Sequence, residues 1–218
     1  MPGWALPVAR NMAGGLEATM LLSVVTAIAA MLAGVVLGSL ATVRSPLVTV
    51  PIRAYVELWR GLPIIVTLFF IFFMLPAVGI RLEAFYAALI GLTLWTSANC
   101  AEIVRGAVRS IPRGQHLAAA ALGLTWVGTM RHVILPQAVL RMLPPLVSLL
   151  ANLVQSTALA AIIGVLELTQ SAQRQIARLT ILGDSHALEI LGAVMLVYFL
   201  LCLPLTRVSA RLERGLAR

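Results

Sequence analysis

Five long stretches without a charged residue most strongly limit how this chain can fold. They lie at residues 18–43, 61–80, 84–101, 142–166 and 190–206 and contain 26, 20, 18, 25 and 17 residues. A helix of about 20 residues crosses the roughly 30 Å apolar core of a bilayer. Backbone polar groups in lipid must pair within their own segment, so each crossing should be helical. The stretches therefore predict an all-α integral membrane protein with five transmembrane helices.

The composition excludes several other classes of protein. Apolar residues make up 61% of the 218 residues and charged residues 11%, whereas soluble domains carry roughly 25% charged residues. All basic residues are arginine, so the chain lacks the lysine of a phosphate-binding P-loop and a lysine for Schiff-base chemistry. A water-soluble domain and a nucleotide-binding enzyme of this type are therefore excluded.

We expect one transmembrane permease domain over residues 1–218. Its spans are expected at roughly 16–43, 54–76, 83–107, 137–158 and 187–207, with a cytoplasmic loop at 108–136. Of the 16 arginines, 12 then fall on the face that carries this loop and 4 on the other. Because arginine-rich loops stay in the cytoplasm, the amino terminus is predicted outside and the carboxyl terminus inside. This asymmetry explains the net charge of +8 without nucleic acid.

Local signals in the loop predict two short helices joined at a glycine. Pro112 suits the first turn of one helix, and Gly123 suits the left-handed residue that ends it. Thr125 can cap a second helix, which we expect Pro136 to stop before the fourth span begins. Such an element would offer a small, partly apolar surface to a cytoplasmic partner.

The same segment resembles the EAA loop of ABC importer permeases. The signature of that loop is E-A-A, followed after three residues by G, after nine more by I, and after one more by L-P. The positions that fall on this spacing are Ala118, Ala119, Gly123, Val133, Leu135 and Pro136. Further stretches resemble the polar amino-acid uptake branch, of the histidine, glutamine and arginine type. They are Trp59–Pro63, Ala101–Gly106, Ser110–Gln115, Leu135–Ala138, Asn152–Leu159 and Ile163–Thr169. This ordered set covers roughly residues 16–207.

The resemblance implies a function, partners and a coupling site. Permeases of this family are multi-pass proteins of the bacterial inner membrane, and their EAA loop docks on an ATPase dimer that hydrolyses ATP. It also implies a second permease copy or a homologous permease, an extracytoplasmic solute-binding protein and a small polar solute. The implied coupling residues are Leu117, Ala118, Ala119, Leu122 and Gly123. Leu117 occupies the position of the usual glutamate of the signature. One charged contact that the family makes with the ATPase is therefore in doubt for this chain.

Polar residues inside apolar spans are costly, so they are candidates for the solute pathway. They are Asn99 in the third span and Asn152, Gln155, Ser156 and Thr157 in the fourth. Asn152, Gln155 and Ser156 share one helix face by their spacing. These amides and hydroxyls either bind a zwitterion in a water-filled cavity or only hold helices together by hydrogen bonds.

Several other residues have structural interpretations. Glu102 with Arg105, and Glu57 with Arg60, are spaced three apart and are expected to form ion pairs. Gly34 and Gly38 form a G-x-x-x-G step, which is either a helix-contact face for a partner or ordinary packing within the subunit. Residues 167–188 are expected to form an outer-face loop with a short amphipathic helix, which either receives a solute-binding protein or is simply solvated.

No catalytic, metal-binding or cofactor-binding pattern is visible in the sequence. Cys100 and Cys202 lie inside apolar stretches and form no C-x-x-C pair, and the three histidines lack ligand spacing. We therefore predict the permease subunit of an ATP-driven importer for a polar amino acid or a similar zwitterion, without its own ATPase site. A secondary carrier and a non-transporting membrane scaffold are the alternatives. Buried carboxylates and inverted halves, which a carrier usually shows, are missing.

Overall fold

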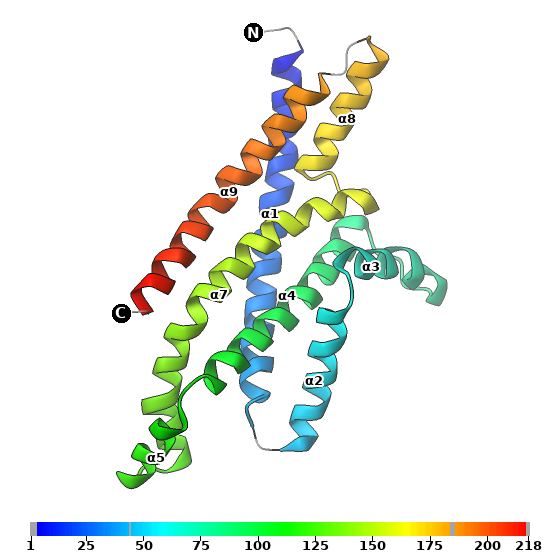
Figure 1. The fold of residues 1–218 in the computed structure, drawn as a ribbon. Coiled ribbons are helices and arrows are strands. Elements are labelled where there is room, and N and C mark those ends of the chain that lie inside the picture. Colours follow the sequence, from blue (N-terminus) through cyan, green and yellow to red (C-terminus); the bar gives the residue numbers. More distant parts are fainter. Residues whose placement is uncertain (1–3, 44, 184–185, 217–218) are drawn as a thin grey trace. The chain divides into compact units, whose positions relative to one another are not determined.

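The computed structural model describes residues 4–43, 45–183 and 186–216 of the chain, and every helix within these ranges is shown in Figure 1. Arg44, Asp184 and Arg218, which enter the charge counts above, lie outside the described residues. The described residues contain no β-strand, so the prediction of an all-α protein is confirmed. The helical elements are α1 (Ala5–Leu40), α2 (Pro46–Gly61), α3 (Ile64–Phe69), η1 (Phe70–Met74), η2 (Leu75–Val78), α4 (Ala84–Arg109), α5 (Arg113–Ala121), α6 (Trp126–Thr129), η3 (Met130–Ile134), α7 (Leu135–Ser156), η4 (Thr157–Ile163), α8 (Leu168–Ile181) and α9 (Ala187–Leu216).

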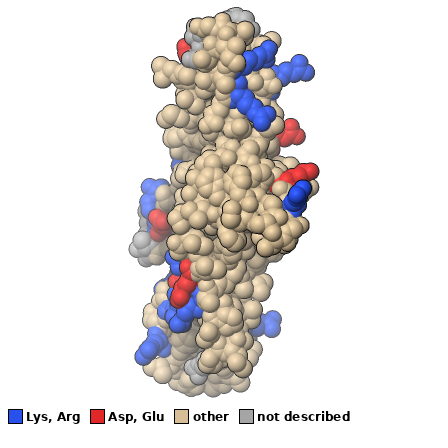
Figure 2. Space-filling view, turned by 90° about the vertical axis from the view of Figure 1, so that its right-hand side faces the viewer, with Lys and Arg blue, Asp and Glu red and all other residues tan. Residues whose placement is uncertain are grey.

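Four helices within the described ranges are long and apolar enough to cross a membrane: Ala5–Leu40, Ala84–Arg109, Trp126–Ile163 and Ala187–Leu216. A fifth crossing is possible if α2 and the segment Ile64–Val78 count as one interrupted span. Many large apolar side chains of these helices are exposed, among them Leu32 at 67% and Met195 at 73%. Most of the face in Figure 2 is uncharged, and its acidic and basic side chains gather in small groups. Such a surface suits contact with lipid.

The second predicted span differs from the structure. We expected one helix over 54–76, but α2 begins earlier, at Pro46, and ends at Gly61. Pro63 precedes the next helix in an extended conformation, with φ −59° and ψ 133°. Because a proline pushes the residue before it out of the helical region, the pair Leu62 and Pro63 interrupts the helix inside an uncharged stretch.

The expected stop at Pro136 is absent from the structure. Residues Trp126–Ile163 form one continuous span of 38 residues. The π-helical turn η3 ends at Ile134, two residues before the proline, and the N–H of Leu135 bonds to the carbonyl of Met130, five residues back. A π-turn changes the local register of carbonyls and so relieves the clash that a proline ring makes with an α-helical backbone.

The chain divides into two compact units, and the boundary falls within α1, α4, α7 and α9. The first unit comprises Met1–Ile28, Leu62–Leu94 and Ala151–Pro204. One of its cores packs Leu22, Leu68, Leu92 and Leu153, and each of these side chains is at most 1% exposed. A second core joins α8 to the start of α1 and of α9, as the ribbon in Figure 1 also shows, through Val8, Met12, Leu168, Ala172, Ile190 and Val194.

The second unit comprises Ala29–Gly61, Trp95–Leu150 and Leu205–Arg218. In it, Ile52 and Val56 of α2 pack with Ala101 of α4. Gly38 of α1 also lies against α4, because a Cβ built on it would be 2.5 Å from the carbonyl oxygen of Ala101. A Cβ built on Gly34 would likewise lie against the side chain of Cys100, so the G-x-x-x-G step serves packing within this chain. Cys100 and Cys202 are buried, and neither forms a disulfide within the described residues.

Candidate functional site

The segment that resembles the EAA loop consists of α5, a tight turn and α6. Gly123 has a φ of +76°, which confirms the predicted left-handed residue after the first helix. The Thr125 hydroxyl accepts a hydrogen bond of 3.2 Å from the N–H of Gly128, so the predicted cap of the second helix is confirmed. The local rules for prolines, glycines and caps therefore place this turn where the sequence predicts it.

The predicted coupling residues are exposed with one exception. Leu117 and Leu122 are 72% and 82% exposed, while Ala119 is buried at 3% and packs α5 onto its own chain. Ala118 and Gly123 are exposed as well. Exposed leucines on a segment of two short helices are unusual for a surface that stays in water, and they suit a surface that another protein covers.

Two side chains that sequence reasoning did not single out anchor this segment. Arg141 of α7 donates from Nη1 to the carbonyl oxygen of Ser110, at 2.7 Å, and to the Ser110 hydroxyl, at 3.2 Å. Gln137 donates to the Gln115 side chain at 3.5 Å and to the Val133 carbonyl at 2.8 Å. The end of α4, α5 and the start of α7 are thereby joined by hydrogen bonds, so they can move as one body. The pattern Leu135–Ala138 contains Gln137, but nothing in its spacing indicates a partner 22 residues away.

The predicted pathway residues of α7 and η4 divide into two groups. Asn152 and Gln155 are exposed, and no hydrogen bond of their side-chain amides occurs within the described part of the chain. The Ser156 hydroxyl is half-buried and donates to the carbonyl of Asn152 at 2.8 Å. Thr157 is fully buried and donates to the carbonyl of Val154 at 2.7 Å. The two amides therefore have no partner within the described residues, whereas the two hydroxyls are used by the backbone at the end of α7.

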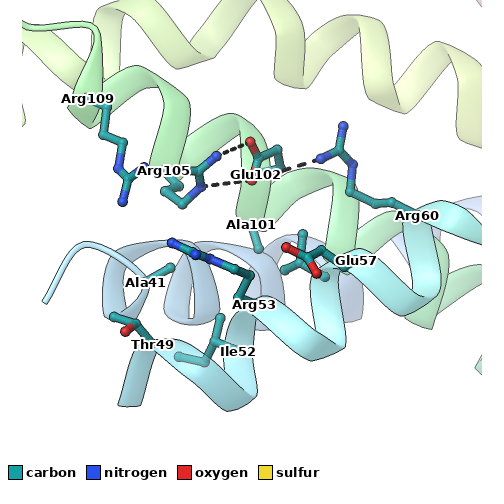
Figure 3. Close-up of a pocket in the computed structure, with 11 residues that line it drawn as sticks. Ala41, Thr49, Ile52, Arg53, Glu57, Arg60, Ala101, Glu102, Arg105 and Arg109 are labelled. Atoms are coloured by element: carbon teal, nitrogen blue, oxygen red, sulfur yellow. Dashed lines mark hydrogen bonds and ion pairs between the residues drawn. The ribbon is translucent and has the colours of Figure 1, made fainter. Parts of the chain in front are cut away.

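Asn99 lies in the other unit and belongs to a different cluster. Its side chain donates to the carbonyl of Trp95 at 2.8 Å and accepts from Nε of Arg60 at 3.3 Å. The same Arg60 lies 3.9 Å from the Glu102 carboxylate, which also holds Arg105 through two hydrogen bonds. Figure 3 shows Glu102 between these two guanidinium groups. The amide of Asn99 is thus already engaged by protein groups.

The predicted ion pairs have opposite outcomes. The pair of Glu102 with Arg105 is confirmed. The pair of Glu57 with Arg60 is wrong for the described structure, because Arg60 turns to Asn99 and Glu102 instead. Both glutamates line a pocket of about 350 Å³, together with four arginines: Arg53, Arg60, Arg105 and Arg109.

Glu167, expected at the start of an outer-face loop, is fully buried. It caps α8 by accepting hydrogen bonds from the N–H groups of Thr169, at 2.9 Å, and Gln170, at 2.8 Å. The Tyr198 hydroxyl of α9 donates to the same carboxylate at 2.8 Å. Next to it, the Thr19 hydroxyl of α1 accepts from the N–H of Leu168 at 3.1 Å. The expected short helix is confirmed as α8, and buried polar contacts fix its first turn to α1 and α9.

Three buried hydroxyls were also missed by sequence reasoning. Ser23 and Thr26 of α1 and Thr96 of α4 have no hydrogen-bond partner in the described structure. A threonine or serine inside an apolar helix gives little signal, because it can always bond its own backbone. Within the described ranges, no three His, Cys, Asp or Glu side chains lie close enough to share a metal ion.

Comparison with known proteins identifies the family. The model of the family described as "Binding-protein-dependent transport system inner membrane component" matches residues 30–218. The probable glutamine ABC transporter permease protein GlnP of Bacillus subtilis is 35% identical over 199 residues, which are 91% of this chain and 90% of that protein. The glutamine transport system permease protein GlnP of Escherichia coli K12 is 43% identical over 162 residues, 73% of this chain and 72% of that protein.

Solved structures have the same fold. The crystal structure of an amino acid ABC transporter with histidines matches with a TM-score of 0.87 and 26% identity, covering 96% of both chains. An inward-facing MetNI methionine ABC transporter matches with a TM-score of 0.76 and 23% identity, covering 97% of this chain and 99% of that one, which concerns the fold alone. Importers of this kind work with ATPase and solute-binding protein partners. The chain belongs to the binding-protein-dependent inner membrane components and is a multi-pass permease subunit of an ABC importer, in which separate ATPase subunits hydrolyse ATP.

Proposed function

We propose that this permease passes a polar amino acid or a similar small zwitterion. The exposed amides of Asn152 and Gln155 carry the proposal, because both lie on one face of an apolar span without an internal partner in the described part of the chain. An amide offers both a carbonyl acceptor for an ammonium group and N–H donors for a carboxylate. The names of the relatives, which are glutamine and amino-acid permeases, support the same class of solute.

The remaining pathway candidates receive a supporting role in this proposal. Thr157 and Ser156 hold the transition from α7 into η4 through their backbone hydrogen bonds. Asn99 positions Arg60 in the cluster around Glu102. Solute contact is therefore assigned to Asn152 and Gln155, with the half-buried Ser156 at their side.

The coupling surface is proposed to consist of Leu117, Ala118, Leu122 and Gly123, with Ala119 as the buried anchor beneath them. The exposure of both leucines supports docking on the ATPase. Replacement of the usual glutamate by Leu117 makes this contact more apolar. Hydrogen bonds from Arg141 and Gln137 would then carry ATPase movement into α4 and α7 as a rigid-body tilt.

The arrangement in the membrane is proposed from charge and from the number of spans. The arginine-rich side with α5 and α6 faces the cytoplasm, so the amino terminus is outside and the carboxyl terminus inside. Five spans from one chain enclose little space. Two permeases, identical or homologous, therefore share a central path above an ATPase dimer.

The solute assignment is tested with Gln155→Leu, measured as uptake of an amino-acid panel into vesicles that contain the complete transporter and its binding protein. We expect uptake to fall at least about tenfold, the effect of losing one or two hydrogen bonds to a charged group, with ATPase assembly intact. Asn11→Leu, at an exposed amide of α1 that bonds only to the carbonyl of Pro7, is the matched control and should transport normally. Unchanged uptake in Gln155→Leu would refute the role of this amide.

The coupling surface is tested with Leu122→Asp, measured as the amount of ATPase that co-purifies with the permease. The side chain is 82% exposed, so the fold should survive while a desolvated carboxylate weakens docking by several kcal/mol. Leu182→Asp, at a leucine that is 72% exposed at the end of α8, introduces the same charge on the face proposed to lie outside. Equal ATPase retention in both variants contradicts the docking surface, and loss only in Leu182→Asp reverses the proposed orientation.

A further inference from the structure

The pocket that α2 and α4 line in the second unit carries several charged side chains. It has a volume of about 350 Å³, within the range of about 300–1,000 Å³ typical of small-ligand sites. Four arginines and two glutamates line it, which leaves a net charge of +2. Ile52, Val56 and Ala101 form an apolar part of the same wall. The combination suits a ligand with one anionic group and an apolar remainder.

The charges of this pocket are only partly neutralised by protein groups. Glu102 is shared by Arg105 and Arg60. Arg53 and Arg109 are exposed and make no hydrogen bond or close ion pair in the described part of the chain, although Arg109 is near enough to Glu102 to interact with its charge. Figure 3 shows their side chains, from α2 and α4, together with Arg105 around the pocket. Guanidinium groups bind phosphate oxygens in pairs of parallel hydrogen bonds, so two arginines on neighbouring helices whose N–H groups are not used by the protein form a suitable phosphate clamp.

The position of the pocket along the spans indicates where such a phosphate would come from. The uncharged stretch of α4 ends at Ala101, and the pocket uses the following turns, from Glu102 to Arg109. Ala41 lies directly after the end of α1 and lines the same pocket. Because both helices leave their apolar stretches here, the pocket lies at the level of the lipid headgroups. With the orientation proposed above, this is the cytoplasmic leaflet, which attracts basic side chains through its anionic lipids.

We propose that this pocket binds the phosphate ester of an anionic glycerophospholipid, with Arg53 and Arg109 as the phosphate contacts and Ile52 and Val56 beside the glycerol end of the acyl chains. Glu102 keeps Arg60 and Arg105 in place on the pocket wall. The site is separate from the amides assigned to the solute and from the leucines assigned to the ATPase. Lipid binding can therefore be measured independently of solute uptake.

The test uses the purified complete transporter in detergent and a titration with short-chain phosphatidylglycerol, followed by thermophoresis. A charge-assisted hydrogen bond to the phosphate contributes about a tenfold change in affinity, and glutamine keeps a weaker one, so Arg53→Gln with Arg109→Gln should weaken binding at least about 25-fold. The matched control is Arg207→Gln with Arg211→Gln, which removes the same charge from exposed positions of α9 in the same unit. The control should bind within about twofold of the unchanged protein.

Further arms separate the sources of phosphate and the effect of charge alone. Phosphatidylcholine of the same chain length should bind at least tenfold more weakly, and inorganic phosphate should compete only at much higher concentration. Arg53→Lys with Arg109→Lys keeps the charge but loses the paired hydrogen bonds, and it should bind with intermediate affinity. Equal losses in the pocket and control variants overturn the proposal. The proposal is also overturned if inorganic phosphate binds as tightly as the lipid, or if the lipid binds only after the ATPase is removed.

Discussion

Removing the buried carboxylate of Glu167 should strongly destabilise the first unit. The fully buried side chain accepts three hydrogen bonds, from two N–H groups of α8 and from the Tyr198 hydroxyl. Glu167→Ala removes the helix cap, which costs about 1–2 kcal/mol. It also leaves the half-buried Tyr198 hydroxyl without its carboxylate, which costs about 1–3 kcal/mol. The expected loss in the free energy of unfolding is therefore about 2–5 kcal/mol.

The assay is reversible unfolding of the purified permease in mixed micelles of increasing SDS fraction. Tyr198→Phe removes one of the three bonds to Glu167, together with the 3.4 Å contact to the Thr169 hydroxyl, and should cost about 0.5–1.5 kcal/mol. Glu167→Gln should fall between the two variants, because its amide nitrogen cannot accept the second backbone N–H. The double variant Glu167→Ala with Tyr198→Phe should cost less than the sum of the single losses, because both remove the same hydrogen bond.

A matched control and a clear negative result make this prediction decisive. Glu17→Ala removes an exposed glutamate from α1 in the same unit and should change the free energy of unfolding by no more than about 0.5 kcal/mol. A loss below about 1 kcal/mol in Glu167→Ala would show that water or lipid headgroups replace the carboxylate, and the buried cap would then not hold α8 to α9.

Two further substitutions test contacts of the second unit. Gly38→Ala should destabilise the chain by about 1–2 kcal/mol in the same SDS titration, because its Cβ would lie 2.5 Å from the Ala101 carbonyl oxygen. Gly14→Ala, in the same helix with nothing within 4 Å of the new Cβ, should instead stabilise it by about 0.5–1 kcal/mol; the same sign for both would contradict the close approach. Arg141→Gln should leave ATPase binding intact but lower solute uptake per ATP about fivefold, since losing the bonds to Ser110 frees the end of α4 at a cost of about 1 kcal/mol. An unchanged ratio of uptake to ATP hydrolysis would refute this role of Arg141.

The parts of the fold that follow from local rules could be predicted from the sequence. Uncharged length alone located the four long apolar helices, because the cost of a charge in lipid does not depend on tertiary contacts. The turn at Gly123 and the cap at Thr125 were also predictable, since each needs only its neighbours in sequence. The same local rules indicate a break at Pro63, but a span predicted only from the uncharged residues 61–80 takes no account of this proline.

Residues whose role depends on tertiary contacts could not be placed from the sequence. Asn152 and Thr157 lie five positions apart in one apolar stretch, yet the first is exposed and the second fully buried. On an ideal α-helix their side chains point about 140° apart, so spacing separates the two faces, but it does not say which face packs against the rest of the chain. Likewise, an acidic residue after an apolar span suggests a solvent-facing loop, and only the distant Tyr198 reveals that Glu167 is a buried cap.

The partner of Arg60 shows why spacing alone fails for charges near a membrane. Glu57, three residues away on α2, is exposed, and a pair between exposed side chains gains only about 0–1 kcal/mol. The Glu102 carboxylate is only 28% exposed, so it has lost much of its hydration and interacts more strongly with nearby cations. The guanidinium of Arg105 neutralises part of the Glu102 charge, and Arg60 from another helix adds a second cation beside it. Arg60 therefore pairs with the less hydrated carboxylate, that of Glu102. Sequence spacing alone favours Glu57, whose carboxylate is exposed and hydrated.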